Sequence, residues 1–157
     1  MKNFLYFVAI ITLFGCQDDI QTSNPTLQGL RHGDEIWRAT TRTATLQTTG
    51  ILNLSGSDGF GTVIISLPSA TVGEYPLGEG QLATITYTEL NTTYSTQNNG
   101  NEYPVYLGDG KVTIDAINAE NKTLRGTFYF NSYDSTGTKY MNFSEGVFYN
   151  LQFTTGE

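Results

Sequence analysis

From Ile36 onward, apolar and polar residues alternate with a period of two, and turn-forming residues repeatedly interrupt the alternation. This pattern is typical of β-strands joined by short turns, and no segment shows the spacing of an amphipathic helix. The predicted strands are residues 36–46, 51–55, 61–67, 83–89, 111–117, 123–133, 139–143 and 146–153. A further short strand is expected at 103–107, at an edge of the sheet because Pro104 lacks a backbone donor.

Turn motifs between these segments predict hairpins. In each motif an Asp or Asn, whose side chain can hydrogen-bond to nearby backbone, precedes a glycine, which tolerates positive φ. The motifs are Asp58–Gly59, Asn99–Gly100 and Asp109–Gly110. Strands connected in this way pair antiparallel. The expected fold is therefore all-β, an antiparallel β-sandwich or a flattened barrel of about eight or nine strands, and we favour the sandwich.

One face of each predicted strand supplies apolar side chains for a core. Gly126 shares its face with Phe128, and its missing side chain would let another backbone or a large ring come close. The predicted core residues are Trp37, Val63, Ile65, Leu67, Val112, Ile114, Ala116, Leu124, Phe128, Phe130, Val147, Tyr149, Leu151 and Phe153.

The first 15 residues differ in character from the rest of the chain. One cation, Lys2, precedes an uninterrupted apolar stretch from Phe4 to Phe14. As a helix this stretch would be roughly 16 Å long, too short for a hydrocarbon layer of about 30 Å. Residues 1–15 are therefore predicted to be a cleaved secretory signal peptide.

The next residue, Cys16, predicts a lipid anchor. Leu13, Phe14, Gly15 and Cys16 resemble the lipobox of bacterial lipoproteins, in which the cysteine carries a diacylglycerol and its freed amine is acylated. Several acyl chains hold a protein to a membrane stably, whereas one holds it only reversibly. Cys16 is the only cysteine, so no disulfide can form. An ordinary secreted protein with an incidental cysteine is the alternative.

Residues 16–29 are predicted to be the lipidated cysteine and a flexible tether, because they are polar, contain Pro25 and show no periodicity. Residues 30–157 are predicted to be a single β domain, as expected for a chain of this length.

Several segments of this body resemble a known family. They are GEYPLG at 73–78, KVTIDAINAENKTLRGTFYFNSY at 111–133 and SEGVFYNLQF at 144–153. Together with the leader they resemble small lipoproteins of Bacteroidota that carry a domain of unknown function. Acidic residues close behind the lipidated cysteine, here Asp18 and Asp19, are similar to the surface-export signal of those lipoproteins. In other Gram-negative lineages they would indicate inner-membrane retention. The resemblance implies an outer-membrane protein exposed at the cell surface, and it implies no activity.

Charge narrows the possible partners. Fifteen acidic residues against eight lysines and arginines give a formal charge of −7. Such a surface repels phosphate backbones, so no nucleic-acid partner is expected. The expected partners are the membrane, through the N-terminal lipid, and a glycan or protein ligand.

Groups that could support catalysis or hold a metal are few. The only histidine, His32, lies beside Asp34 and Glu35 in a stretch predicted to be an entry loop. No GxSxG motif occurs, and GSDGFG at 56–61 lacks the lysine and following helix of a phosphate loop. No enzyme activity, catalytic residue, metal site or cofactor is therefore predicted. Carboxylate pairs that would suit glycoside hydrolysis if they faced each other are Glu74 with Glu79 and Glu102 with Asp109.

Tyrosines suggest recognition chemistry, because a tyrosine joins rigid apolar area to a hydrogen-bonding group. They accompany the polar stretch NTTYSTQNNGN at 91–101 and the outward face of strand 123–133. The candidate binding residues are Tyr87, Tyr94, Tyr103, Tyr106, Tyr129 and Tyr133. The alternative is that these side chains only cover the second sheet.

A turn near the C-terminus holds a candidate modification site. Asp134, Ser135 and Thr136 resemble the three-residue acceptor of O-glycosylation in exported Bacteroidota proteins, with Ser135 as the acceptor. The favoured function is a non-enzymatic, surface-displayed binding module for a glycan, peptide or partner protein. A passive envelope-assembly lipoprotein and an unrecognised hydrolase are the alternatives.

Overall fold

Alternating residues form strands over most of residues 24–156, the part of the chain that the computed structural model describes. No helix occurs within that range. The predicted strand 61–67 is observed with these bounds, and Val63, Ile65 and Leu67 are fully buried. The strands are β1 (Thr26–Arg31), β2 (Glu35–Arg38), β3 (Thr41–Leu46), β4 (Leu52–Ser57), β5 (Gly61–Leu67), β6 (Gly73–Gly78), β7 (Thr84–Glu89), β8 (Thr92–Ser95), β9 (Asp109–Asn118), β10 (Thr123–Asp134), β11 (Tyr140–Gln152) and β12 (Thr154–Thr155).

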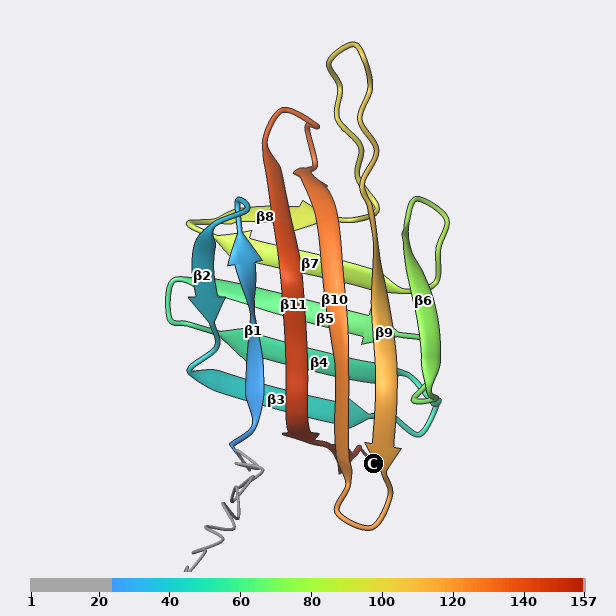
Figure 1. The fold of residues 1–157 in the computed structure, drawn as a ribbon. Coiled ribbons are helices and arrows are strands. Elements are labelled where there is room, and N and C mark those ends of the chain that lie inside the picture. The colour runs from blue at the N-terminus through green and yellow to red at the C-terminus, as the bar shows by residue number, and fades with distance from the viewer. Residues whose placement is uncertain (1–23, 157) are drawn as a thin grey trace, which may run out of the picture.

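The strands form two layers that face each other across the core. Strands β3, β4, β5, β7 and β8 make one layer, and β2, β1, β11, β10, β9 and β6 make the other (Figure 1). Strands of one layer run across those of the other, as in sandwiches whose sheets are packed orthogonally. The layers belong to one continuous hydrogen-bonded sheet, because β8 pairs with the end of β10 at a corner. The all-β prediction is confirmed.

Aromatic rings from both layers meet at the centre of the core. The ring of Phe143 on β11 lies 5.0 Å from that of Phe130 and 5.6 Å from that of Trp37, and 5.3 Å from that of Tyr87 on the opposite layer. Each of these side chains is at most 2 % exposed. The predicted burial of Trp37 is confirmed, and its ring packs against that of Phe143 in the core.

Gly126 has the role expected from the sequence. A Cβ at this position would lie 1.9 Å from the carbonyl oxygen of Thr113 and 2.4 Å from Cζ of Phe148. Only a residue without a side chain therefore allows β9 and the Phe148 ring to come this close.

The C-terminal strand differs from the prediction. Segments 139–143 and 146–153 are one strand, β11, whose pairing with β10 shifts at two places. Glu145 and Asn150 have φ of 49° and 47°, so an extra residue enters the strand at each place and changes which residues face inward. Phe148 is consequently buried, whereas Val147 and Tyr149, which were predicted as core, are partly exposed.

The predicted tether also ends earlier than expected. Residues 26–29 begin β1, which pairs with β11 on one side and β2 on the other, and Leu27 is fully buried. The period-two signal there is only a few residues long and follows Pro25, so the sequence alone suggested irregular chain.

The predicted strand 103–107 is not formed, and 96–108 is an irregular loop that rises from one end of the molecule (Figure 1).

Candidate functional site

The upper ends of β10 and β11 in Figure 1 and the loop 96–108 enclose an open hollow on the outer surface. Its volume is about 430 Å³, within the range of small-molecule sites. A second hollow of about 260 Å³ adjoins it and shares Tyr106, Tyr133 and Tyr140. We call the two together the tyrosine hollow; their lining is Gly100, Glu102, Tyr103, Pro104, Tyr106, Leu107, Asp109, Asn131, Tyr133, Gly137, Thr138 and Tyr140.

Strand alternation directs Tyr133 into this hollow. Along β10 the even-numbered residues from Phe128 to Asp134 are buried, so the odd-numbered ones face outward. Tyr133 stands opposite Tyr140 of β11 in the register, and the two rings lie 6.1 Å apart with a 42° tilt. Burial, followed by the proximity of Tyr140, Asp109 and Tyr106, raises the pKa of Tyr133.

Asparagine side chains fasten the loop to the hairpin formed by β10 and β11. The amide of Asn98 donates to the carbonyl of Tyr133 at 3.0 Å, and that of Asn101 donates to the carbonyl of Thr136 at 2.7 Å. The side-chain oxygen of Asn99 accepts from the backbone of Gly108 at 2.9 Å. The asparagines at the end of the polar stretch 91–101 thus hold the tyrosines of the loop beside those of the sheet.

Rings are available to a ligand on both sides of the hollow. Tyr103 and Tyr106 of the loop are 97 % and 66 % exposed, and Tyr140 of the sheet is 49 % exposed. Exposed apolar side chains that cluster around one hollow are typical of ligand-binding surfaces.

Polar groups lie on the floor of the hollow. The amide of Asn131 donates to Asp109 Oδ1 at 2.7 Å, across the register that pairs β10 with β9. This contact uses one of the four hydrogen bonds that the amide can make and leaves the second carboxylate oxygen of Asp109 to other donors. The floor can therefore both donate to and accept from a ligand.

Another hollow lies near the turn between β9 and β10, at the opposite end of the molecule (Figure 1). It measures about 510 Å³, but no aromatic ring lines it and Arg125 is its one charged group. Size alone does not make a site, so the aromatic and polar lining of the tyrosine hollow makes that hollow the stronger candidate.

Comparison with known families supports the sequence resemblance in its general form. The model of a domain of unknown function, DUF6252, matches residues 23–152. The chain belongs to this family. No curated protein and no solved structure is found to match it. The role of the tyrosine hollow in this DUF6252 domain therefore depends on the hollow's own residues.

The structure places the six candidate tyrosines in four different surroundings. Tyr103, Tyr106 and Tyr133 line the hollow, and Tyr129 is 49 % exposed on the same outer face of β10. Tyr94 is only partly exposed and packs against the core, and burial raises its pKa. Tyr87 is fully buried, so its ring is not offered to a ligand.

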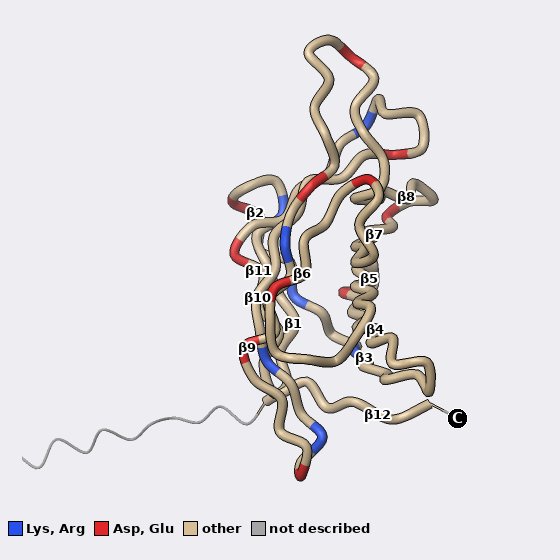
Figure 2. Tube along the Cα trace, turned by 90° about the vertical axis from the view of Figure 1, so that its right-hand side faces the viewer, with Lys and Arg blue, Asp and Glu red and all other residues tan. Residues whose placement is uncertain are grey.

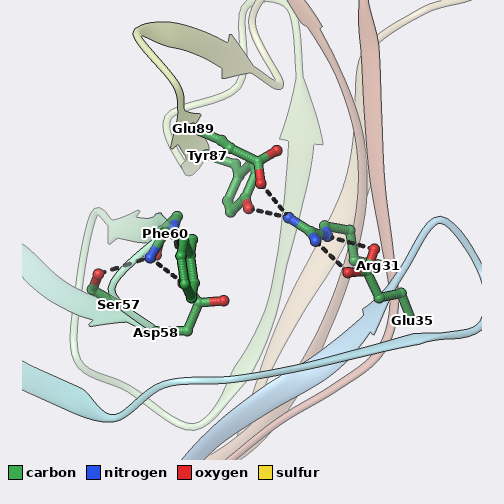
Figure 3. A network of polar contacts seen from close by, with 8 residues as sticks. Arg31, Glu35, Ser57, Asp58, Phe60, Tyr87 and Glu89 are labelled. Carbon is green, nitrogen blue, oxygen red and sulfur yellow. Dashed lines mark hydrogen bonds and ion pairs between the residues drawn. The ribbon is translucent and has the colours of Figure 1, made fainter.

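Tyr87 belongs to a network that joins the two layers of the DUF6252 domain (Figure 3). Its hydroxyl accepts from Arg31 Nη1 at 2.7 Å, and the same nitrogen donates to Glu89 at 2.6 Å, while Glu35 pairs with the rest of the guanidinium. The pKa of Arg31 is raised mainly by its hydrogen bonds to Glu35, and the same hydrogen bonds lower the pKa of Glu35. Because Arg31 comes from β1 and its partners Tyr87 and Glu89 from β7, the network connects the layers.

Tyr140 is a lining residue that sequence reasoning missed. It falls inside the predicted strand 139–143, and the turn at 135–137 predicted a hairpin with the strand that holds Tyr133. A three-residue turn at 135–137 would have paired Tyr133 with Lys139. The observed register places Tyr140 opposite Tyr133, one residue further along, so the turn motif alone did not identify this contact.

Ser135 is exposed in the turn between β10 and β11. The neighbouring Asp134 turns inward and accepts hydrogen bonds from Thr136 Oγ1 and from the backbone of Thr138 and Lys139, at 2.7 to 3.0 Å. These bonds, that from Lys139 foremost, lower the pKa of Asp134. Glycosylation of Ser135 stays a prediction.

The other candidate groups are dispersed. His32 packs its ring 6.2 Å from that of Tyr140, while Glu35 is held by Arg31. Among the described residues, no three His, Cys, Asp or Glu side chains are placed to hold a metal. Nor does any helix in residues 24–156 have the length and apolarity needed to cross a bilayer. Cys16 lies outside the described residues.

Proposed function

We propose that this DUF6252 protein is a non-enzymatic binding module of the bacterial cell envelope. Lipid on Cys16 holds it at the outer membrane, and the tyrosine hollow takes up a glycan, a peptide or part of a partner protein. The observation that carries the proposal is the joint placement of Tyr103, Tyr106, Tyr133 and Tyr140 around one hollow with a polar floor.

The direction of the chain supports this assignment. The described chain begins at Asn24, beside the lower end of β1 in Figure 1, whereas the hollow opens at the upper ends of β10 and β11. The described chain thus begins at the end opposite the hollow, which supports an anchor that leaves the hollow accessible. The leader's resemblance to Bacteroidota lipoproteins supports display on the outer surface of the cell.

The test is capture of ligands by the full-length chain in detergent micelles. Wild type, Tyr133→Ala and Tyr106→Ala are applied to an array of glycans and peptides, with Tyr149→Ala as control because Tyr149 is on the same strand face far from the hollow. We expect saturable binding to at least one probe, about tenfold weaker in the two hollow variants and unchanged in the control. Binding to no probe, or equal binding by all four proteins, would overturn the proposal in favour of a passive envelope role.

A further inference from the structure

We infer that the ligand is an uncharged linear glycan, which runs from the tyrosine hollow along the outer face of β10 to Tyr129. This inference rests on the proposed function and specifies its ligand. It draws on the chemistry of the hollow, on the charges around it and on the pairing of β10.

The hollow combines the two kinds of group that a sugar ring requires. The face of a tyrosine ring is electron-rich and complements the weakly positive C–H groups on the face of a pyranose. The hydroxyl groups around the pyranose ring both donate and accept hydrogen bonds. They can donate to the free carboxylate oxygen of Asp109, and they can bond the remaining amide donor and acceptor of Asn131.

Charges along this path favour a neutral ligand. Glu102 and Asp109 are the charged groups that line the hollow, so an anionic ligand would be repelled there. Figure 2 shows the two layers from the side and an acidic residue near the tip of the loop above them. Two residues further along β9, Lys111 stands opposite Tyr129 and pairs with Glu74 at 2.7 Å. The acidic groups of the hollow oppose a polyanion, and Lys111, already paired with Glu74, offers such a ligand no free cation farther along. The charges on the path therefore favour a neutral glycan over an acidic one.

The binding path extends beyond the hollow. Tyr129, Asn131 and Tyr133 are alternate residues of β10 and face outward together. At about 3.3 Å per residue, the two tyrosines are about 13 Å apart along the strand, with Asn131 and Asp109 between them. A chain of sugars can stack on both rings and bond the polar pair between them, whereas a single ring cannot reach both.

Pairing of β10 argues against an extended peptide. Such peptides commonly bind by adding a strand to an exposed sheet edge, where main-chain groups are free. β10 is paired with β9 along one side and with β11 along the other. A ligand on this face of β10 must therefore be held by side chains. The aromatic and amide side chains present there are groups that bind a glycan.

The experiment measures affinity as a function of chain length. Full-length protein in detergent micelles is titrated with uncharged linear oligosaccharides, from disaccharides to hexasaccharides of glucose, mannose and xylose. We expect at least one series to bind, with about tenfold tighter binding for the longest members, since a second stacking contact is then made. Tyr129→Ala should remove this gain and leave the shortest ligand unaffected, while Tyr133→Ala should weaken all lengths. Tyr149→Ala should match wild type.

Other outcomes separate the two proposals. If Tyr133→Ala still folds and impairs binding of peptides or charged glycans, but no neutral oligosaccharide binds, the inference fails and the proposed function stands. If affinity does not change with length, or Tyr129→Ala behaves as wild type, the extended path is wrong. Tyr106→Ala serves in place of Tyr133→Ala if the latter does not fold, because the Tyr106 side chain is 66 % exposed. If no probe shows binding that depends on either tyrosine, both proposals fail.

Discussion

At the residue scale, burial decides what each tyrosine can do. Tyr87 lies against Gly61, where a Cβ would come within 2.1 Å of the tyrosine oxygen, and its hydroxyl bonds Arg31. Tyr133 occupies an outward position on β10 and stays beside the hollow. The two side chains have the same chemistry, and only their positions relative to the two layers make one structural and the other available to a ligand.

Burial of Tyr87 also predicts a loss of stability in alkali. Burial raises the pKa of Tyr87 from 10.0 to about 12, so the folded chain holds this proton more tightly than the unfolded chain. The contribution of Tyr87 to the free energy of unfolding is therefore fully present below about pH 10 and is lost as the pH rises toward about 12. In urea unfolding followed across this range, Tyr87→Phe should lose stability less steeply than wild type. At neutral pH it should be less stable by about 1 to 2 kcal/mol, because the bond to Arg31 is lost.

Tyr149→Phe is the matched control, since it removes a hydroxyl from a partly exposed position on the outer face. An identical alkaline slope in wild type and Tyr87→Phe would contradict the assignment.

At the element scale, the hairpin of β10 and β11 holds half of the site. Its turn depends on Asp134, whose carboxylate accepts three hydrogen bonds from Thr136, Thr138 and Lys139. Gly137 and Thr138 of the same turn line the hollow. The geometry of the turn and that of the hollow are therefore linked.

This link predicts an effect of acid on the DUF6252 domain. The pKa of Asp134 is lower in the folded chain than its ordinary value of 3.8, so its contribution is present above that pH and is lost as the pH falls through the folded-state value. Asp134→Asn should lower the urea midpoint at neutral pH and reduce the further loss in acid. Asp115→Asn, at an exposed position of β9, is the control. The prediction is wrong if Asp134→Asn and Asp115→Asn have equal midpoints at neutral pH.

The elements also show where the sequence pattern was sufficient. β5 and the inward face of β10 follow from alternation alone, because each keeps one phase from end to end. β11 could not be predicted in the same way, since the bulges at Glu145 and Asn150 change its phase and carry Phe148 into the core. A bulge is stabilised by its partner strand, and a period-two pattern does not record the partner.

At the scale of the whole molecule, the position of the first described residues is compatible with a lipid anchor, and substitution of Cys16 tests that anchor. The body begins at the end remote from the hollow, so an anchor at Cys16 would leave the hollow accessible. Cys16→Ser should move the protein from the membrane fraction to the soluble fraction and abolish incorporation of radiolabelled palmitate. The intact mass of the mature wild-type chain should equal the polypeptide from residue 16 plus a diacylglyceryl group and the acyl chain on its amine. A further hexose-sized increment that is absent from Ser135→Ala would report sugar on Ser135.

Lys111→Ala provides a control for fractionation, because it removes a cation from the body and leaves the cysteine in place. Unchanged fractionation of Cys16→Ser would exclude the anchor.

The sequence by itself determined the all-β class, most strand positions and the outward direction of Tyr129 and Tyr133, because alternation and turn chemistry act over a few neighbouring residues. It also predicted the lipid anchor, which depends on a short local motif. Only the tertiary structure decided which tyrosines share a hollow, because Tyr106 and Tyr140 come together through contacts between a loop and a hairpin that are distant in the chain. Burial of Tyr87 likewise depends on the opposite layer, which no local pattern specifies.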